Sequence, residues 1–209
     1  LIPTLIRYGE AANAYGDYQQ AESSARECLT VAESINALNS VAHATTLMGQ
    51  IASSQEDYER ARTLFEKSLK LSRKLADKRR IGFSSGYLGD ILYAQEQYEQ
   101  AARCYQEALE VFQKINVEWF AAIFQRLGYV LLRQQRWHEA YIHLVKSLTL
   151  LREREGPREN KFLLTGFAGV AEGQGRLARS AQLLGAANTY PPLITTWWVI
   201  KLFRREYDR

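Results

Sequence analysis

The hydrophobic positions of the chain follow a helical period that breaks at regular intervals. In the segment 88–97, Leu88, Ile91 and Leu92 fall along about two helical turns, and Glu96 and Gln97 then form a short polar break. After the break, apolar residues return at i, i+3, i+7, i+10 and i+11, and these are Tyr98, Ala101, Tyr105, Ala108 and Leu109. The pattern predicts two helices joined by a short turn, which is a helical hairpin.

This hairpin pattern recurs with a period of about 40 residues. The second helix of each copy starts with an aromatic residue that precedes an alanine by three positions, at Tyr18, Tyr58, Tyr98 and Trp137, and a weaker copy starts at Leu177. A small residue stands nine positions before each start, at Gly9, Gly49, Gly89, Gly128 and Ala168. We call this small residue the packing position, because antiparallel helices approach closely only where side chains are minimal.

The repeats predict an all-α fold with one domain over residues 1–209. The predicted hairpins span residues 2–37, 41–77, 81–116, 119–155 and 160–189. We expect them to stack as a right-handed superhelical solenoid, because each repeated unit buries its apolar face only against its neighbours. Pro191 and Pro192 end the fifth hairpin, and residues 191–209 are predicted to form a capping helix.

Composition supports a helical globular protein and excludes several other classes. The chain is 46% hydrophobic and 24% charged, with only four prolines. The net charge of +4 comes from interleaved acidic and basic residues, so we expect neither a nucleic-acid partner nor a membrane. Two cysteines, Cys28 and Cys104, are too few for a disulfide framework and indicate a cytoplasmic location. Because the first residue is leucine and no signal peptide precedes the repeats, we expect the chain to be part of a longer protein.

The pattern of glycine, aromatic residue and alanine resembles the tetratricopeptide repeat over roughly residues 5–190. Two segments, LADKRRIGFSSGYLGDILYAQEQYEQA and GFAGVAEGQGRLARSAQLLGAAN, look like the C-terminal repeats of bacterial LuxR-type and cyclase-linked ATP-binding regulators of the STAND class. This resemblance implies an upstream nucleotide-binding domain, often with a DNA-binding or cyclase domain, and repeats that sense an inducer or a protein partner. One departure from the family pattern is Ala76, which stands where a glycine is usual.

The first helices of stacked hairpins form a concave wall, and such walls bind extended peptides or helices. Residues at offsets −3, +1 and +4 from the packing position lie on the side of the first helix that faces away from the second helix. The candidate binding residues are Glu10, Asn13, Thr46, Gln50, Ser53, Asp90, Tyr93, Gln125, Tyr129, Thr165 and Glu172, with His43, Phe83 and Arg133 at the edges. Their rings and amides suit a protein, a peptide or a small inducer. The competing interpretation is an ordinary solvated helix surface.

Other residues with reactive or ligating side chains are better explained by architecture. The repeated aromatic residues and the two cysteines lie on the apolar face of the second helices, where they are expected to pack in the core. His138 and His143 are five residues apart, and no carboxylate or cysteine completes a metal site with them. The basic residues between Lys67 and Arg80 have the spacing of a solvated helix face. We therefore predict no metal, no cofactor and no catalytic residue.

The segment after Pro192 is predicted to make a separate contact. Ile194, Trp198 and Leu202 form a stripe at i, i+4 and i+8, and Trp197 lies beside it. We predict that Trp197, Trp198 and Leu202 cap the end of the solenoid, or form a homodimer contact where part of the patch stays uncovered.

Taken together, the residues and the resemblance predict a non-catalytic repeat domain of a bacterial signalling or transcriptional regulator, which binds a protein, a peptide or an inducer. One alternative is a stand-alone scaffold or a pheromone-peptide receptor built from similar repeats. A different class of alternative is an enzyme with an irregular site.

Overall fold

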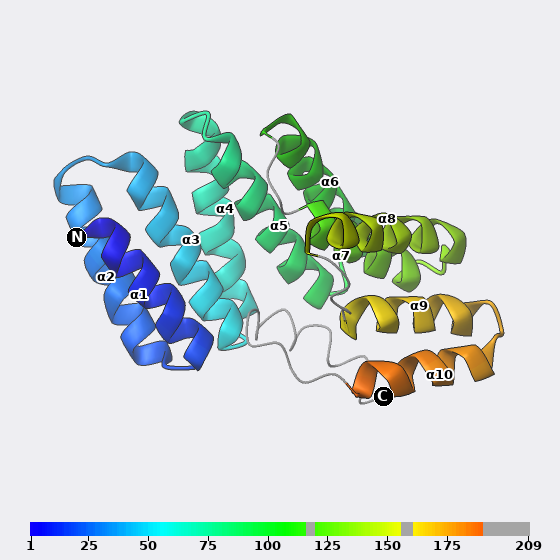
Figure 1. Ribbon diagram of the computed structural model, residues 1–209. Helices are drawn as coiled ribbons and strands as arrows, with labels where there is room; N and C mark the ends of the chain where they lie inside the picture. The colour runs from blue at the N-terminus through cyan, green and yellow to red at the C-terminus, as the bar shows by residue number, and fades with distance from the viewer. Residues whose placement is uncertain (116–119, 156–160, 190–209) are drawn as a thin grey trace. The chain divides into compact units, whose positions relative to one another are not determined.

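The computed structural model describes residues 1–115, 120–155 and 161–189, and every regular element within them is an α-helix. These helices are α1 (Ile2–Tyr15), α2 (Tyr18–Ser34), α3 (Leu38–Ser54), α4 (Tyr58–Lys74), α5 (Lys78–Ala94), α6 (Tyr98–Ile115), α7 (Phe120–Arg133), α8 (Trp137–Glu155), α9 (Lys161–Gly173) and α10 (Leu177–Asn188) (Figure 1). All five second helices begin at the residues that the repeat predicts. The all-α prediction is confirmed, and the predicted capping helix lies outside the described residues.

The chain forms two compact units that divide at the turn between α5 and α6. In unit 1, which contains α1 to α5, each helix packs against the next one in the chain, and α3 also contacts both α1 and α5. In unit 2, which contains α6 to α10, consecutive helices pack in the same way, and α7 also contacts α9. Within each unit the first helices therefore lie beside one another.

The packing positions are small because bulky side chains lie directly against them. A Cβ added to Gly49 would lie 2.7 Å from the ring of Phe65 on α4, and one added to Gly128 would lie 2.8 Å from Leu144 on α8. Gly9 is equally crowded, since its Cβ would lie 2.8 Å from a side chain of α3. These distances are shorter than van der Waals contact. The prediction that close helix approach explains the glycines is confirmed at these three positions.

Each core combines small and large residues from both the first and the second helices. In unit 1, Ala21 and Ala25 of α2 pack with Leu47 and Ile51 of α3. The equivalent cluster of unit 2 consists of Leu131, Ala140, Leu144, Leu163 and Val170. Small residues on the second helices let the neighbouring first helix come close, which is how a repeat buries its apolar face.

Each turn inside a hairpin contains one residue in the left-handed backbone region, seven residues after the packing position. Glycine holds this conformation in the first and fifth copies, with φ of 82° at Gly16 and 73° at Gly175. Non-glycine residues hold it in the other copies, at Glu56, Glu96 and Gln135. The turns between hairpins use the same conformation at Asn36 and Ala76, where φ is 53° and 54°.

Buried hydroxyl groups join α3, α4 and α5 in unit 1. The Ser68 hydroxyl of α4 donates to the carbonyl oxygen of Ala42 at 2.9 Å. Its oxygen also lies 2.7 Å from the Thr46 hydroxyl and 3.1 Å from the Ser84 hydroxyl. These bonds satisfy polar groups that the packed helices would otherwise leave unpaired.

The position of Ser68, ten residues after the start of the second helix, recurs with a different residue in other copies. In α8 it is Ser147, whose hydroxyl donates to the carbonyl oxygen of Ala121 at 2.7 Å. In α2 it is Cys28, which is fully buried. Burial raises the pKa of the Cys28 thiol, so the thiol stays protonated at neutral pH.

Replacing Gly49 with alanine is expected to lower the free energy of unfolding by about 1–3 kcal/mol, because the new Cβ collides with the Phe65 ring. Gly185→Ala is the matched control, since Gly185 also lies within a helix and its Cβ would meet nothing within 4 Å. That control is expected to be neutral or to stabilise by up to about 1 kcal/mol through helix propensity. Urea unfolding followed by circular dichroism measures both changes. Equal destabilisation by the two substitutions would contradict the close-approach explanation.

Ala76→Gly is expected to raise the free energy of unfolding by about 1 kcal/mol, because an L-residue with a Cβ is disfavoured in the left-handed region. Gly16→Ala is the reverse change at a turn with nothing within 4 Å of the added Cβ, and it is expected to lower stability by a similar amount. The same unfolding experiment compares them. An Ala76→Gly variant no more stable than the parent chain would show that backbone strain is absent at this turn.

Candidate functional site

The clearest row of candidate residues lies on the first helices of unit 1. At offset +4 from the packing positions stand Asn13 on α1, Ser53 on α3 and Tyr93 on α5. Their exposed fractions are only 8%, 2% and 4%. The helix α3 packs against both α1 and α5, so the three residues lie on adjacent first helices. The structure buries all three side chains.

Two polar atoms in this row are buried without a partner. The Oδ1 atom of Asn13 and the Oγ atom of Ser53 have no hydrogen-bond partner among the described residues. A buried polar atom that lacks a hydrogen bond costs about 1–3 kcal/mol, and such atoms are rare in folded proteins. Two of them lie at equivalent positions of adjacent first helices.

The row at offset +1 carries charge and amide groups. Glu10 is exposed, Gln50 is half-buried and Asp90 is buried. The Oε1 atom of Glu10 lies 3.6 Å from Nε2 of His43, which connects α1 to α3 across the wall. Because both side chains remain well exposed, this pair contributes little to stability.

Arg80 on α5 belongs to this region, although the sequence analysis placed it in a solvated basic face. Its Nε atom is buried and has no hydrogen-bond partner among the described residues. Desolvation lowers the pKa of the Arg80 guanidinium, while the nearby carboxylates of Asp77 and Glu10 act in the opposite direction. The sequence could have predicted this burial, because Arg80 precedes Phe83 by three residues and Tyr87 by seven, which places all three on one face of the helix.

Two other candidates of unit 1 are held by contacts within the protein. The Thr46 hydroxyl donates to the carbonyl oxygen of Ala42 at 2.9 Å and contacts α4 through the buried hydroxyl group described above. The ring of Phe83 stacks on Tyr87 with centroids 6.3 Å apart, and the Arg79 guanidinium lies 5.8 Å from the Phe83 centroid. These contacts fix both side chains beside the row.

In unit 2 the candidate with the clearest contact is Tyr129 of α7. It is buried, and its hydroxyl donates to the carbonyl oxygen of Phe162 on α9 at 2.7 Å. The bond joins two adjacent first helices. The other candidates of this unit are Gln125 and Thr165, which are half-buried, and Arg133 and Glu172, which are exposed.

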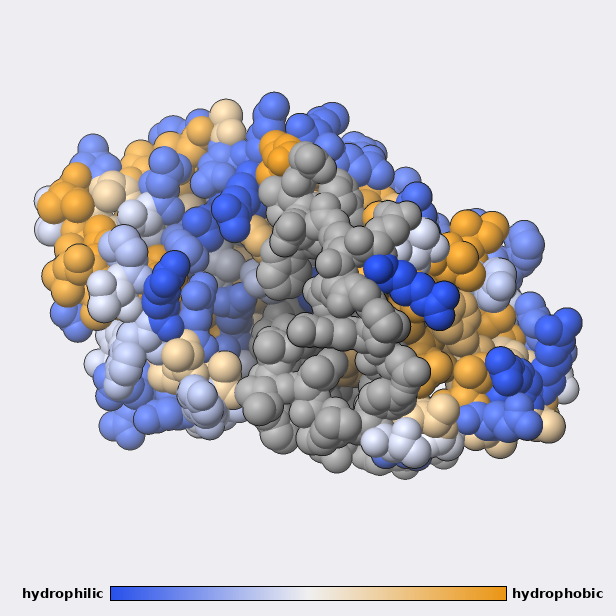
Figure 2. Space-filling view, viewed as in Figure 1, coloured by the Kyte–Doolittle hydropathy of each residue, from blue (hydrophilic) through white to orange (hydrophobic). Residues whose placement is uncertain are grey.

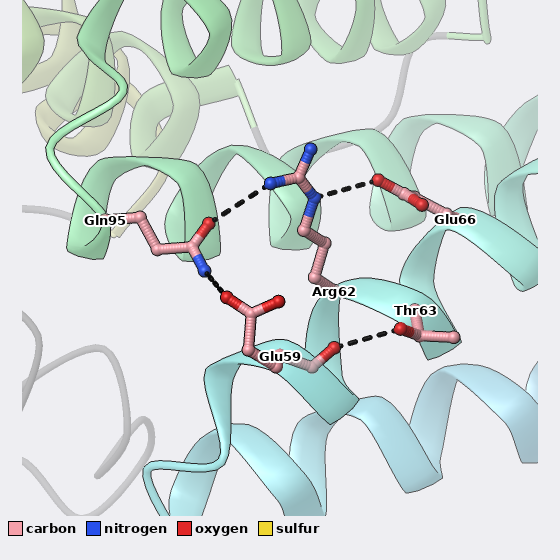
Figure 3. Close-up of polar contacts among 5 residues, drawn as sticks. All are labelled: Glu59, Arg62, Thr63, Glu66 and Gln95. Carbon is pink, nitrogen blue, oxygen red and sulfur yellow. Dashed lines mark hydrogen bonds and ion pairs between the residues drawn. The ribbon is translucent and has the colours of Figure 1, made fainter.

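The polar residues of α4 and of the end of α5 differ, because they form hydrogen bonds with one another. The Gln95 amide donates to Glu59 at 2.6 Å and accepts from Arg62 at 3.5 Å (Figure 3). Arg62 also donates to Glu66 at 3.0 Å, and the Thr63 hydroxyl donates to the Glu59 carbonyl oxygen. Because these groups find partners within unit 1, the network fixes α4 against α5 and needs no ligand.

The described residues hold no group of three or more His, Cys, Asp and Glu side chains that could bind a metal ion. In this same part of the chain, none of the helices combines the length and the apolar content needed to cross a membrane. Trp197, Trp198 and Leu202 lie outside the described residues, so their role as a cap or dimer contact stays a prediction.

Residues 40–114 match the family model of the tetratricopeptide repeat. No curated protein sequence is significantly similar to the chain. Among solved structures, BtubC (BKLC) from P. vanneervenii is similar with a TM-score of 0.73 and 19% identity, over 88% of this chain and 80% of that protein.

The names of two further similar structures mention a bound factor or a sensor. A Rap protein complexed with Competence and Sporulation Factor has a TM-score of 0.73 and 13% identity, over 98% of this chain and 58% of its own. A Signal Transduction ATPase with Numerous Domains (STAND) protein with a tetratricopeptide repeat sensor, from Pyrococcus horikoshii, has a TM-score of 0.65 and 16% identity, over 99% of this chain and 36% of its own. This chain therefore spans only about half of the Rap protein and a third of the STAND protein. At these identities the likeness concerns the fold. Residues 40–114 thus carry tetratricopeptide repeats, and the fold of the chain is that of a tetratricopeptide-repeat solenoid.

Proposed function

We propose that this chain is the partner-binding repeat region of a bacterial signalling regulator, and that the offset +4 row of unit 1 binds an extended peptide segment. The observation that carries this proposal is the pair of buried, unpartnered atoms, Oδ1 of Asn13 and Oγ of Ser53. Tetratricopeptide repeats act in general as protein-interaction modules without catalytic activity, which agrees with a binding role.

The unpartnered atoms offer the hydrogen-bonding groups that a peptide needs. The Asn13 Oδ1 atom accepts a hydrogen bond, the Arg80 Nε–H group donates one, and the Ser53 hydroxyl can do both. An extended peptide presents alternating N–H and C=O groups along its main chain, so it can pair with all three once these buried side chains turn toward it. Glu10 supplies charge and His43 a polar ring on the same wall, and both would favour a polar side chain in the partner.

The sensing role has separate support. The segments 75–101 and 166–188 resemble the repeats of bacterial multidomain regulators. The fold is similar to that of a Rap protein bound to Competence and Sporulation Factor and to that of a STAND protein with a tetratricopeptide repeat sensor. A peptide ligand is favoured over a small-molecule inducer because the unpartnered atoms are spread over three adjacent helices.

Removing either unpartnered atom is expected to weaken peptide binding. Random linear peptides displayed on phage are selected against the full chain, and calorimetry then measures the affinity of a selected peptide. Ser53→Ala and Asn13→Ala are each expected to weaken it about 5- to 10-fold, which corresponds to one lost hydrogen bond. Ser53→Ala is expected to keep or raise thermal stability, because it removes a buried hydroxyl that makes no hydrogen bond within the protein.

Ser72→Ala is the matched control, because the Ser72 hydroxyl is also buried and unpartnered but lies on α4. It is expected to bind the peptide as the parent chain does. Equal affinity of the Asn13, Ser53 and Ser72 variants would remove the row as the binding site. A selection that yields no binding peptide would contradict the peptide-binding role.

The regulator role is tested by the coding sequence that lies directly upstream of Leu1. We expect it to encode, in the same reading frame, a nucleotide-binding domain with a phosphate loop of the form G-x-x-x-x-G-K-[ST]. A coding sequence that starts at Leu1 would contradict the regulator role and would leave peptide binding in place.

A further inference from the structure

The second half of α4 and the start of α5 carry an unbalanced charge. Positions 61–80 contain eight lysine and arginine residues and two acidic ones, so this segment has a net charge of +6, whereas the whole chain has +4. Figure 2 shows hydrophilic side chains over α4 and α5. Five exposed cations of the segment form no ion pair with any residue that the structure describes, and these are Lys67, Lys70, Lys74, Lys78 and Arg79. We call these five residues the basic surface.

The two acidic residues of this segment are engaged elsewhere. The Oε1 atom of Glu66 lies 3.0 Å from Nε of Arg62. Asp77 is the N-cap of α5, and its Oδ1 atom accepts a hydrogen bond from the backbone N–H of Arg80 at 2.9 Å. Neither carboxylate forms an ion pair with a residue of the basic surface.

Contact with water explains why these positions are polar, but it leaves their single sign of charge unexplained. Lys67, Lys70 and Lys74 follow one another by three and four residues on α4, so like charges are neighbours on one helix face, which opposes helix formation. Other helices place opposite charges at this spacing, as in the ion pairs of Glu22 with Arg26, Arg62 with Glu66, and Arg136 with Glu139. The basic surface therefore departs from the charge pattern of the other helices.

The start of α5 shows the same imbalance. Lys78 and Arg79 stand in its first turn, which contains no acidic residue. Because the N-terminus of a helix carries a partial positive charge, cations in the first turn are unfavourable. The first turns of α4, α6 and α8 instead contain Glu59, Glu99 and Glu139. An anionic group bound beside Lys78 and Arg79 would remove this repulsion.

The surroundings of the basic surface favour a protein partner over a nucleic acid or a membrane. Single-stranded nucleic acids stack on exposed aromatic rings, and membrane-surface helices carry large apolar residues beside their cations. Between positions 61 and 80 no large hydrophobic residue is exposed, and the half-buried ring of Phe83 lies against the Arg79 guanidinium. Four of the five cations are lysines, whereas phosphate recognition prefers arginine.

We propose that the basic surface docks an acidic helix of a partner protein. Lys67, Lys70 and Lys74 lie on one face of α4 along about two turns, so a helix whose carboxylates repeat every three or four residues can pair with all three. Lys78 and Arg79 follow after the short turn 75–77 and extend the positive potential that attracts such a helix. The proposal does not depend on peptide binding by the offset +4 row, because none of the five cations belongs to that row.

The experiment measures, by fluorescence anisotropy, the affinity of the 209-residue chain for two labelled alanine-rich helical peptides. One peptide has glutamates every three or four residues on a single face, and the other has the same composition with the glutamates spread around the helix. We expect the first peptide to bind about 5-fold more tightly, and its affinity to fall as salt is added. The triple variant Lys67→Gln, Lys70→Gln, Lys74→Gln is expected to bind the first peptide about 10-fold more weakly, because each exposed ion pair contributes a few-fold. Glutamine keeps the helix propensity of lysine, and circular dichroism checks the fold.

The matched control removes the same charge from three exposed positions of unit 2, with Lys114→Gln, Lys146→Gln and Arg179→Gln. It is expected to bind the first peptide as the parent chain does. Equal weakening by the two triple variants would overturn the proposal, because net charge alone would then explain binding. Equal affinity for the two peptides, or no binding of either, would also overturn it.

Two further comparisons separate this proposal from its alternatives. Tighter binding to a duplex DNA oligonucleotide, or to vesicles of phosphatidylserine and phosphatidylcholine, than to the first peptide at the same salt concentration would overturn the choice of a protein partner. Ser53→Ala is expected to bind the glutamate peptide as the parent chain does, and the Lys67, Lys70 and Lys74 variant is expected to keep its affinity for the phage-selected peptide. Each of the two binding sites can therefore fail its test without the other.

Discussion

The close approach of a first helix to a bulky side chain on its neighbour sets the arrangement of the whole chain. Leu144 of α8 shows the principle, because an added Cβ on Gly128 of α7 or on Gly166 of α9 would lie 2.8 Å from it. One side chain therefore positions the first helix of its own hairpin and that of the next. Phe65 does the same in unit 1, where it lies against Gly49 and stacks on Tyr87 of α5 at 5.4 Å. The repeat propagates because each bulky residue is shared by two hairpins.

The close packing of the helices also affects which polar groups find hydrogen-bond partners. Between α4 and the end of α5, long side chains such as Glu59, Arg62 and Gln95 reach across and pair with one another. On the first helices, the short side chains of Asn13 and Ser53 leave atoms without a partner. Short side chains do pair elsewhere in unit 1, since the Ser68 hydroxyl of α4 lies 3.1 Å from that of Ser84 on α5. The network of Figure 3 joins α4 to the end of α5, and the unpaired atoms of Asn13 and Ser53 lie outside it.

The positions of the second helices were predictable because they depend on local patterns. An aromatic residue, an alanine three residues later and a small residue nine residues earlier place Tyr18, Tyr58 and Trp137 at helix starts without any knowledge of distant contacts. The resemblance to tetratricopeptide repeats rests on the same local marks, and the family match at residues 40–114 agrees with it. Helical period and side-chain volume are properties of short segments, which is why the sequence alone was sufficient here.

The state of the candidate residues was decided only by tertiary structure. Helical geometry predicted that Asn13, Ser53 and Tyr129 share a face, but their burial depends on helices about 30 or more residues away in the chain. The bond from Tyr129 to the Phe162 carbonyl and the burial of the Arg80 Nε atom have the same origin. Whether a polar atom finds a partner is a property of all the helices around it, so a pattern along one helix identifies the face and only the packed structure shows which atoms remain unpaired.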